Sequence, residues 1–542
     1  MEYTQNFIGL YTKSFRNHYD YLALSNYATD VKFTYGDMAK EIAKLHILFE
    51  EQNVKQGEKI ALIGKNNACW CIIFMASIAY GAVIVPILQD FSADDVHHIV
   101  HHSGSKLLFA SDSMLKNLDK KQMPSLKAAF PFSDKNLLDL QDSLDKKFAK
   151  KYPKGFTAED IRYPELPNEN LVILNYTSGT TGFSKGVLLT GNNLVGNLGF
   201  AHQEMKIKKG DNLVSLLPLA HAYGCGFEFL FPMKEGCHVI LLGKTPSPNI
   251  LLGAFGEYKP SLIIAVPLIL EKIYKRMIVP VVSKKSFAIA LKVPLLNQLL
   301  YSVIRKKLIK ALGGQFIQVV IGGAPLNAEV EEFLLKIKFP VSVGYGMTEC
   351  APLVSFSLYP QYVPLSCGKI LPNMQVRIDS PDPYTTAGEI QVKGQNVMVG
   401  YYNNEEATKN AFTADGWLKT GDLGTIDKDN NVFIRGRSKD MLLSATGQNI
   451  YPEEIEAKLN NLPYVGDSLV VYRNGKLLAL VYPDYETVKQ NGVSQDGLRK
   501  IMDENKVALN KMVASYSKIA EIQLTDEFEK TPKKSIKRYL YK

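Results

Sequence analysis

Residues 176–186 read YTSGTTGFSKG, a run of hydroxyls and glycines followed by a single lysine. Apolar runs at 171–174 and 187–189 flank it, so we expect a loop between two strands. Gly179 and Gly182 can adopt positive φ and let a ligand approach the backbone, and Lys185 adds a positive charge. The hydroxyl donors are Thr177, Ser178, Thr180 and Thr181. This composition favours a loop that binds a polyphosphate.

Two other interpretations of the loop are weaker. A Ser/Thr/Gly linker has a similar composition, but the strands flank this loop too closely. A Walker loop needs a glycine, four residues and then Gly-Lys-Ser/Thr. The only Gly-Lys-Thr of the chain is at 243–245, and His238 stands where the first glycine belongs. The P-loop NTPase class is therefore disfavoured.

The loop resembles the signature of the AMP-forming acyl-adenylate family, which includes acyl-CoA synthetases, luciferases and the adenylation domains of peptide synthetases. Five further motifs of that family follow in order: PLAHAYG at 218–224, GGAPL at 322–326, GYGMTE at 344–349, TGD at 420–422 and GRSKD at 436–440. The resemblance extends from about residue 35 to the C-terminus. Within the family, the chain is similar to bacterial long-chain fatty-acid CoA ligases.

The resemblance implies an enzyme with two half-reactions. A fatty-acid carboxylate would attack the α-phosphate of ATP and release pyrophosphate, and coenzyme A would then take the acyl group from acyl-AMP. ATP, Mg²⁺ and coenzyme A are the cofactors and co-substrates implied. Catalysis of the first step would come chiefly from positioning and charge compensation. Two alternatives stay open: an enzyme that loads the adenylate onto a carrier protein or amine, and a scaffold without turnover.

The same resemblance assigns the nucleotide-binding residues. Those expected at the β- and γ-phosphates are Thr177, Ser178, Gly179, Thr180, Thr181, Gly182 and Lys185. Thr348 would reach the α-phosphate, and Glu349 would ligate Mg²⁺, which prefers oxygen ligands. Those expected around the adenosine are Gly322, Gly323, Ala324, Tyr345 and Gly346. Asp422 would accept hydrogen bonds from the ribose hydroxyls, and Arg437 would donate to the same sugar.

The acyl and coenzyme A sides are assigned in the same way. His221 would help place the carboxylate, with Tyr223, Gly224 and Phe227 at the border of the fatty-acid channel; a satisfied core histidine is the alternative. Amino-acid activation is disfavoured because residues 225–228, CGFE, lack an early aspartate. Lys439 matches the hinge about which the C-terminal domain would rotate, and Gly447 would then approach the pantetheine tunnel.

The C-terminal tail departs from the family's pattern. The catalytic lysine of the family usually precedes an apolar residue and a basic pair, but here Ser535 precedes Ile536-Lys537-Arg538. We therefore expect Lys534 to be the adenylation lysine, with Lys537 as the second candidate. A solvated basic tail is the alternative.

The order of expected elements predicts an α/β fold. Strands and helices alternate from residue 59 to about 349, which is typical of layered, mainly parallel sheets. Shorter strands after Gly368, among them 374–378, 388–392 and 432–434, predict a small β-barrel-like region. A small mobile α+β domain follows, and residues 449–456, with Pro452 and the acids after it, predict a helix start near its beginning. The expected division is an N-terminal domain at 1–436, a hinge at 437–440 and a C-terminal domain at 441–542.

Composition agrees with a large intracellular enzyme. The chain has 542 residues, 46% of them apolar, enough for sizeable cores. Its six scattered cysteines form no disulfide framework, and the first residues lack a secretory signal, so we expect a cytoplasmic location. Residues 69–88 are uncharged and long enough to span a bilayer. Because Gly81 and Pro86 interrupt them, we expect a buried helix, a turn and a buried strand.

Two surface features complete the predictions. The net charge is +9, and basic residues between 276 and 310 alternate with leucines, a pattern typical of an amphipathic helix at an anionic membrane surface. Peripheral contact with the inner membrane face is thus one expectation, and a solvated helix face is the alternative; no nucleic acid partner is expected. Histidines with i,i+4 spacing stand at His97, His98, His101 and His102, but no acid motif accompanies them. A helix packed beside the N-terminal sheet is expected there.

Overall fold

The computed structural model describes residues 2–133, 141–177, 185–244, 246–282, 287, 290, 293, 296–443, 449–473, 476–531 and 535–541. Its contacts divide the chain into two compact units. Unit 1 comprises Met1–Thr177, Ser184–Gln375 and Val392–Gly416, and unit 2 comes mainly from Val376–Gln391 and Trp417–Lys542. The boundary predicted at residues 437–440 lies inside unit 2, and a mobile domain beyond it stays a prediction.

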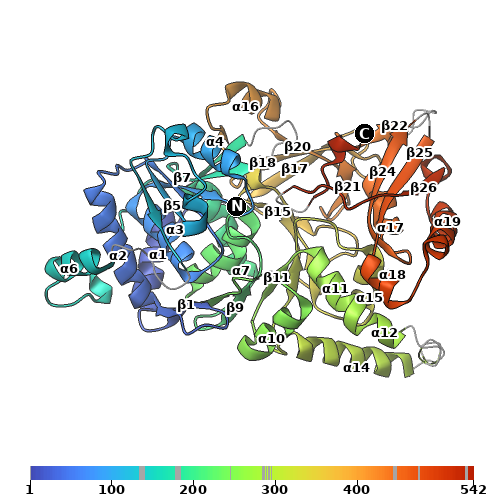
Figure 1. Cartoon of the computed structure of the whole chain (residues 1–542), viewed down its shortest axis with the longest axis horizontal. Coiled ribbons are helices and arrows are strands. Elements are labelled where there is room, and N and C mark those ends of the chain that lie inside the picture. The colour runs from blue at the N-terminus through green and yellow to red at the C-terminus, as the bar shows by residue number, and fades with distance from the viewer. Residues whose placement is uncertain are drawn as a thin grey trace. The chain divides into compact units, whose positions relative to one another are not determined.

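A seven-stranded sheet is the centre of unit 1 (Figure 1). Its order is β19 (Gly400–Tyr401), β8 (Lys185–Thr190), β7 (Leu171–Thr177), β4 (Val83–Ile87), β3 (Lys59–Ile63), β5 (Leu107–Ala110) and β6 (Ala128–Pro131). The strands from β7 to β6 are parallel, whereas β8 and β19 extend the sheet by antiparallel pairing. Parallel strands buried on both faces need helices over each face, and this requirement explains the apolar runs in the sequence.

The uncharged segment at 69–88 is core, as predicted. Helix α3 (Ala68–Tyr80) is buried along almost its whole length, ends at Gly81 with φ of +85°, and is followed directly by the buried strand β4. Glycine suits this left-handed position because it has no Cβ to clash. Within the described ranges, we find no helix with the length and apolar content needed to cross a bilayer.

The histidine-rich segment forms helix α4 (Ala93–Ser103), which begins with a capping box between Ser92 and Asp95. Two of its histidines bind neighbouring groups. The backbone N–H of Asp119 donates to Nε2 of His97 over 2.8 Å, and Nδ1 of His102 lies 2.7 Å from the hydroxyl of Tyr176 on β7. The helix therefore lies beside the N-terminal sheet, as predicted.

Three smaller sheets complete unit 1. The first has the order β2 (Lys32–Thr34), β1 (Leu22–Asn26), β10 (His238–Leu241) and β9 (Asn212–Ser215). The second is parallel and comprises β11 (Ile263–Ala265), β12 (Val319–Ile321) and β13 (Val341–Val343). The third is antiparallel and comprises β14 (Tyr345–Gly346), β15 (Leu353–Phe356) and β16 (Lys369–Ile370). Layered sheets of this kind confirm the predicted α/β class.

Helices after β10 form one side of unit 1, drawn in green to yellow in Figure 1. They are α10 (Pro248–Tyr258), α11 (Pro267–Met277), α12 (Val279–Val282), α14 (Leu296–Ala311) and α15 (Ala328–Lys336). Helix α10 packs against both α11 and α14. Helices α11, α12 and α14 lie between β11 and β12 along the chain, and α15 lies between β12 and β13, so these connections run as the alternating sequence pattern predicts.

Among the described residues, unit 2 contains two larger sheets, the short pair β22 (Leu442–Leu443) and β23 (Asn449–Ile450), and helices that cover one of the larger sheets. One sheet is β17 (Met374–Asp379), β18 (Gly388–Gly394), β20 (Leu418–Ile426) and β21 (Val432–Arg437); the other is β24 (Val465–Arg473), β25 (Lys476–Pro483) and β26 (Glu521–Leu524). The strands predicted as barrel-like, at 374–378, 388–392 and 432–434, thus belong to one open four-stranded sheet, β17-β18-β20-β21, and the described residues form no closed barrel.

Helices α17 (Pro452–Leu459) and α19 (Gln495–Met512) share a hydrophobic core with β24 and β25, to which Ile455, Leu459 and Leu509 contribute. Pro452 opens α17, and Glu453 and Glu454 follow in its first turn. Proline at the first position and acids beside the positive helix terminus are favourable, so the predicted helix start is confirmed.

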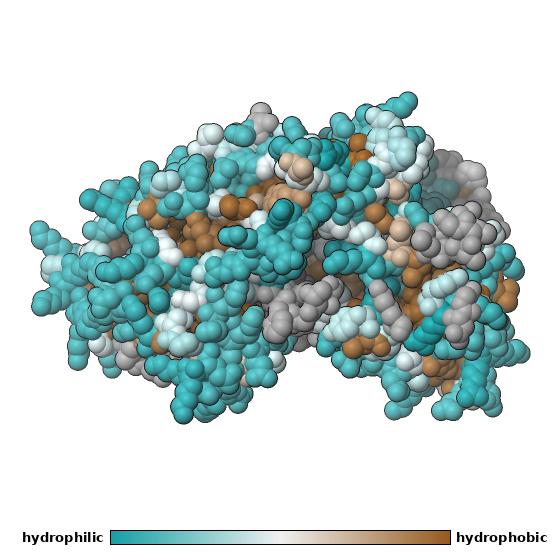
Figure 2. Space-filling view, turned by 90° about the horizontal axis from the view of Figure 1, so that it is seen from above, coloured by the Kyte–Doolittle hydropathy of each residue, from teal (hydrophilic) through white to brown (hydrophobic). Residues whose placement is uncertain are grey.

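The molecular surface is mixed in character. The face shown in Figure 2 is covered mostly by hydrophilic residues, with apolar residues gathered in smaller patches. Isolated exposed apolar side chains are ordinary on protein surfaces, whereas several on one helix face suggest a partner.

Candidate active site

Lys185 is the first residue of β8 and pairs with Thr177, the last residue of β7. The two strands are antiparallel and adjacent in the sheet, so the predicted strand–loop–strand arrangement around the glycine-rich motif is confirmed at both ends. The other predicted phosphate ligands lie outside the described residues: Ser178, Gly179, Thr180, Thr181 and Gly182.

Tyr401 brings Lys185 and Glu349 to one place. Its hydroxyl donates to Oε1 of Glu349 over 2.9 Å, and Nζ of Lys185 lies 4.9 Å from the centroid of its ring. The backbone of β19 fixes this position, because Tyr401 pairs with Val187 of β8 and the N–H of Met398 donates to the carbonyl of Glu349. The lysine predicted for phosphate and the carboxylate predicted for the metal thus contact the same side chain.

The electrostatics of Tyr401 favour its role as a donor. Burial and the neighbouring carboxylate of Glu349 raise the pKa of the phenol, so it stays neutral and keeps its proton at physiological pH. A carboxylate has about four lone-pair sites on its two oxygens, and one hydrogen bond leaves capacity for a cation. Mg²⁺ is commonly held by one or two carboxylates together with substrate phosphates, and the half-buried Glu349 fits that arrangement.

The predicted adenine segments lie at neighbouring strand ends. Ile321 of β12 is in register with Val343 of β13, and the N–H of Gly344 donates to the carbonyl of Ile321 over 2.8 Å. Gly322, Gly323 and Ala324 leave β12 at the same edge where Gly344 and Tyr345 leave β13. In open α/β sheets, ligands bind outside the carboxyl ends of parallel strands. The structure therefore brings the two segments together at an edge suited to a ligand.

Two glycines of this edge have steric reasons to be glycine. A Cβ on Gly322 would lie 2.9 Å from Cζ of Tyr223, whose hydroxyl donates to the carbonyl of Val320. A Cβ on Gly346 would lie 2.1 Å from the carbonyl oxygen of Pro352, and the N–H of Met347 donates to that same oxygen. Close backbone approach explains both residues. Tyr223, predicted for the acyl channel, is thus also a neighbour of the adenine segment.

The loop that carries His221 is held by a buried carboxylate. Glu228 is 1% exposed and accepts hydrogen bonds from the N–H groups of Leu216 and Leu217 and from the hydroxyl of Ser215. It belongs to a π-helical turn, Cys225–Leu230, a rare conformation that is frequent at functional sites. These hydrogen-bond donors lower the pKa of Glu228, but burial has the larger effect and raises it to about 8. Glu228 was not among the site residues predicted from the sequence, although an acid within the apolar run CGFEFLF is a signal that could have marked it.

Two asparagines hold the same loop from the other side. Asn66 donates to the carbonyl of Leu217 over 2.6 Å and accepts from the N–H of Leu219, and Asn175 on β7 donates to the carbonyl of Ala220. His221 itself is half-buried and precedes the short helix α8 (Ala222–Gly224). The loop backbone is therefore constrained on both sides just before His221.

The predicted ribose pair meets in unit 2. Asp422 on β20 is in register with Arg437 on β21, and Nε of Arg437 lies 2.8 Å from Oδ1 of Asp422. The Asp422 side chain is almost wholly buried, whereas that of Arg437 is more than half exposed. Gly421, with φ of +73°, turns the strand just before the aspartate. The oriented carboxylate of Asp422 can accept hydrogen bonds from sugar hydroxyls, and the exposed guanidinium of Arg437 can donate to the same sugar.

The segment after β21 contains the predicted hinge. Lys439 is exposed in the turn that follows Arg437, and the N–H groups of Asp440 and Met441 both donate to the carbonyl of Arg437. The N–H of Ser438 donates to the carbonyl of Gly421. Gly447, predicted near the pantetheine tunnel, lies outside the described residues.

The tail is anchored on both sides of Lys537. Ile536 packs against a cluster that includes Leu469 and Phe528, and Arg538 donates from Nη1 to Oε1 of Glu456 over 2.9 Å. Nε of Arg538 lies 3.7 Å from Asp440 beside the predicted hinge. Lys537 itself pairs with Glu529 at 3.3 Å, and Lys534 lies outside the described residues. Arg538 is an anchoring residue that sequence reasoning did not single out.

Replacing Arg538 by methionine should destabilise unit 2 by about 3–5 kcal/mol, because it leaves the buried Glu456 without its counter-charge. The double variant Arg538→Met, Glu456→Met should recover most of that loss. Hydrogen exchange of α17 and β24 in mild denaturant would report this unit specifically.

Lys537→Met is the matched control, because its exposed ion pair should contribute less than about 1 kcal/mol. A loss below about 1 kcal/mol for Arg538→Met, or no recovery in the double variant, would contradict the anchoring role.

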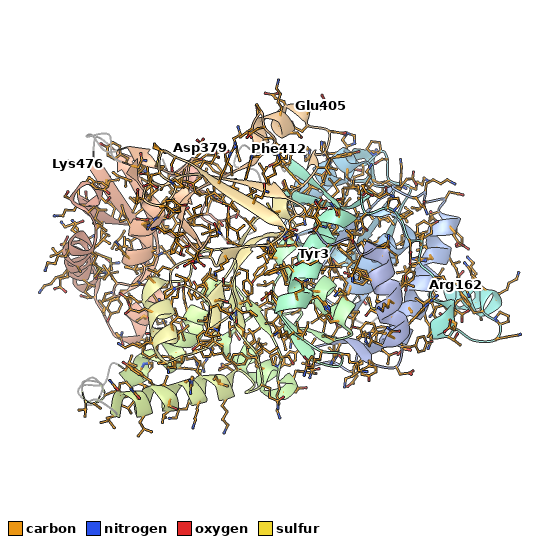
Figure 3. All side chains as sticks on the ribbon, turned by 180° about the vertical axis from the view of Figure 1, so that it is seen from behind. Tyr3, Arg162, Asp379, Glu405, Phe412 and Lys476 are labelled. Carbon is orange, nitrogen blue, oxygen red and sulfur yellow. The ribbon has the colours of Figure 1, made fainter. Side chains whose placement is uncertain are left out.

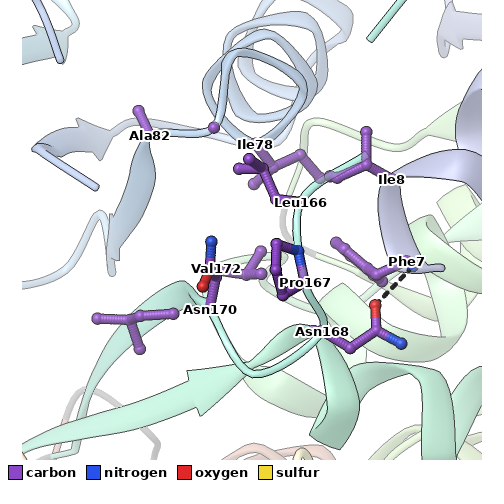
Figure 4. Close-up of a pocket in the computed structure, with 12 residues that line it drawn as sticks. Phe7, Ile8, Ile78, Ala82, Leu166, Pro167, Asn168, Asn170 and Val172 are labelled. Carbon is purple, nitrogen blue, oxygen red and sulfur yellow. Dashed lines mark hydrogen bonds between the residues drawn. The ribbon is translucent and has the colours of Figure 1, made fainter. Parts of the chain in front are cut away.

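One pocket of unit 1 is lined by none of these residues. Helix α1 (Phe7–Asn17), the end of α3 and the segment before β7 line it, chiefly with apolar side chains (Figure 4). Oδ1 of Asn168 accepts from the N–H of Phe7 over 2.9 Å at its rim. The lining includes none of the predicted site residues, and its one marked hydrogen bond ties the N-terminal helix to the body of unit 1.

Comparisons with known proteins agree with this geometry. A profile described as "AMP-binding enzyme" matches residues 11–402. The chain is 32% identical to long-chain-fatty-acid–CoA ligase FadD15 of Mycobacterium bovis, with 82% of this chain and 75% of that protein covered. It is 27% identical to 4-coumarate–CoA ligase CCL1 of Humulus lupulus, with 99% and 94% covered.

Among solved structures, ATP-bound MatB from Rhodopseudomonas palustris is 22% identical, covers 98% of both chains and has a TM-score of 0.77, which shows a shared fold. Enzymes of this kind use ATP, Mg²⁺ and coenzyme A, in agreement with the cofactors expected from the motifs. With its motifs in order, its Lys185–Tyr401–Glu349 arrangement and a profile match over most of its length, the chain belongs to the AMP-binding enzyme family, as an enzyme of the AMP-forming acyl-CoA ligase group.

Proposed function

We propose that the enzyme activates long-chain fatty acids to acyl-AMP and transfers the acyl group to coenzyme A. The observation that carries the adenylation chemistry is the contact of Lys185 and Glu349 with Tyr401, because it puts a cation for phosphates beside a carboxylate for a metal. Support for a long-chain acid comes from the similarity to the long-chain-fatty-acid–CoA ligase FadD15 and from the apolar surroundings of His221.

In the first half-reaction, a carboxylate oxygen of the acid forms a bond to the α-phosphorus while the bond to the pyrophosphate oxygen breaks. Mg²⁺ bound at Glu349 would neutralise phosphate charge. Lys185 would compensate the charge that grows on the departing pyrophosphate, and Thr348 would donate to the α-phosphate. Gly322, Gly323, Ala324, Tyr345 and Gly346 would hold the adenine, and Asp422 and Arg437 the ribose. Positioning and charge compensation are the main sources of rate in such transfers.

In the second half-reaction, the coenzyme A sulfur forms a bond to the acyl carbonyl carbon, the bond to AMP breaks, and the thiol proton is released. Lys439 would act as the hinge between the two conformations, and Gly447 would leave room for the pantetheine arm. His221, on a loop held by Glu228, Asn66 and Asn175, would place the carboxylate in the first step and the carbonyl group of acyl-AMP in the second. A rigid loop beside the reacting carbon is what near-attack positioning requires.

Pyrophosphate release over a series of acids tests the proposal. Acids of about 12–18 carbons should react and acetate should not, because each methylene removed from water contributes about 0.8 kcal/mol to binding. 4-Coumarate belongs in the series because CCL1 is among the relatives. Each acid is assayed with and without coenzyme A, and acyl-AMP, acyl-CoA and AMP are quantified.

The outcomes separate the alternatives. Reaction with acetate or 4-coumarate alone would overturn the long-chain assignment. Acyl-AMP that forms but is not consumed by coenzyme A would favour a carrier protein or amine as the acceptor. No pyrophosphate with any acid would favour the scaffold interpretation.

A further inference from the structure

The positive charge of the chain is concentrated in one segment. Residues 267–311 contain ten lysines and arginines and a single acid, Glu271, which gives this segment a net charge of +9. The whole chain also has a net charge of +9, so the remaining residues are balanced. Seven of these cations lie on helices α11 and α14, and such a concentration creates a local field that attracts anionic partners.

Helix α14 presents one continuous stripe to solvent. Its exposed apolar side chains are Leu296 at 40%, Leu299 at 61% and Val303 at 42%, and Ile304 and Leu308 are buried on the other face. Three exposed lysines follow toward its C-terminus. At 100° per residue, all six side chains fall within an arc of about 100°. We call Leu296, Leu299, Val303, Lys306, Lys307 and Lys310 the α14 stripe.

Helices α11 and α12 extend the same chemistry. Lys272, Lys275 and Arg276 on α11 are exposed, and Val279 and Val281 on α12 are exposed apolar residues. Glu271, the single acid of the segment, points inward: its burial raises its pKa, and it accepts from the N–H of Asn327. Figure 1 shows α14 along the lower margin of unit 1, with α10 at its left end. Helix α10 packs against both α11 and α14, so the two basic helices contact the same helix.

A solvated helix face does not explain the stripe, since such a face would place polar residues where Leu296, Leu299 and Val303 stand. The α14 stripe begins with apolar side chains and ends with lysines. This combination matches a surface that has a hydrocarbon layer beneath anionic phosphates. We propose that the α14 stripe, supported by α11, docks the enzyme on an anionic phospholipid bilayer. Leu296, Leu299 and Val303 enter the acyl boundary, and Lys306, Lys307 and Lys310 contact lipid phosphates.

This surface goes beyond the proposed function, and its test does not depend on the acid used. If the substrate is a long-chain acid, docking would hold the enzyme where such acids partition. The proposals of membrane contact and of acid specificity can therefore be refuted independently. Vesicle binding is measured without substrates, and pyrophosphate release is measured without vesicles.

The test is co-sedimentation of the full-length protein with vesicles of phosphatidylcholine alone or with about one third phosphatidylglycerol. Binding should require the anionic lipid and weaken as salt shortens the screening length. The triple variant Lys306→Gln, Lys307→Gln, Lys310→Gln should lower the partition coefficient about a hundredfold. Leu296→Ser, Leu299→Ser, Val303→Ser should lower it at least tenfold.

A matched control removes three exposed lysines elsewhere: Lys146→Gln, Lys150→Gln, Lys500→Gln. It has the same net charge as the stripe lysine variant and should bind within about twofold of the wild type. All three variants should keep the wild-type rate of pyrophosphate release in vesicle-free solution.

Equal losses of vesicle binding in the stripe lysine variant and the control variant would overturn the proposal, because the net charge of the protein would then explain binding. Binding that is independent of anionic lipid would also overturn it, as would no binding to either vesicle. Self-association that depends on Leu296, Leu299 and Val303, without vesicle binding, would assign the stripe to a second copy of the chain instead.

Discussion

Replacement of Glu349 by glutamine is expected to lower the rate of acyl-AMP formation by about three orders of magnitude. Glutamine keeps the size and can still accept from Tyr401, whose hydroxyl lies 2.9 Å from Oε1 of Glu349. The substitution removes the negative charge that we propose binds Mg²⁺. Charge compensation by the metal during acyl-AMP formation is worth several kcal/mol. The measurement is pyrophosphate release at saturating ATP over a range of Mg²⁺ concentrations.

Two variants make the test specific. Glu405→Gln removes an exposed carboxylate at the first turn of α16 (Glu405–Ala411), which is labelled in Figure 3, and should be silent. Tyr401→Phe removes one hydrogen bond to Glu349 and should lower the rate about fivefold to tenfold. A near-normal rate for Glu349→Gln, with an unchanged Mg²⁺ requirement, would show that the metal is held elsewhere.

The tail lysines should separate the two half-reactions. Lys534→Ala is expected to lower adenylation about a hundredfold or more and to spare thioester formation from preformed acyl-AMP. A lysine there would donate to the α-phosphate and the attacking carboxylate, so its charge matters only while those oxygens are crowded together. Both half-reactions are measured for each variant, the second with synthetic acyl-AMP and coenzyme A.

Lys537→Ala is measured beside it, since Ser535 occupies the position where the family places its lysine. Lys537 pairs with the exposed Glu529, and its neighbour Arg538 is anchored on Glu456. Lys518→Ala, an exposed lysine of the same unit, is the control for charge. If only Lys537→Ala abolishes adenylation, the catalytic lysine is Lys537; if both tail variants are silent, the tail carries none.

Local patterns in the sequence predicted much of the fold. The turn at Gly81 after α3, the hairpin strands at Thr177 and Lys185 and the start of α17 at Pro452 were all placed correctly. Each depends on interactions within a few residues: positive φ at glycine, apolar periodicity, and proline with acids at a helix start. The β-barrel-like region was less well predicted, because sheet closure depends on partners far along the chain.

The contacts that complete the candidate site depend on tertiary structure. Tyr401 joins Lys185 to Glu349 only because β19 pairs with β8, and no local pattern marks this tyrosine. Glu228 reaches the loop before His221 through a π-helical turn, and Arg538 reaches Glu456 from the tail. Which donor meets a buried carboxylate is decided by packing, because an unpaired charge in the interior is too costly to persist.

The sequence by itself determined the order of the motifs, the α/β class and the residue types available for a nucleotide, since these follow from residue chemistry and short-range spacing. Only the tertiary structure decided which of those residues meet. Asp422 and Arg437 become partners through the register of β20 and β21, and the α14 stripe becomes visible only when Ile304 and Leu308 are seen to face inward. The physical reason is that strand register and helix orientation are set by burial against distant segments, and a single sequence does not specify those contacts.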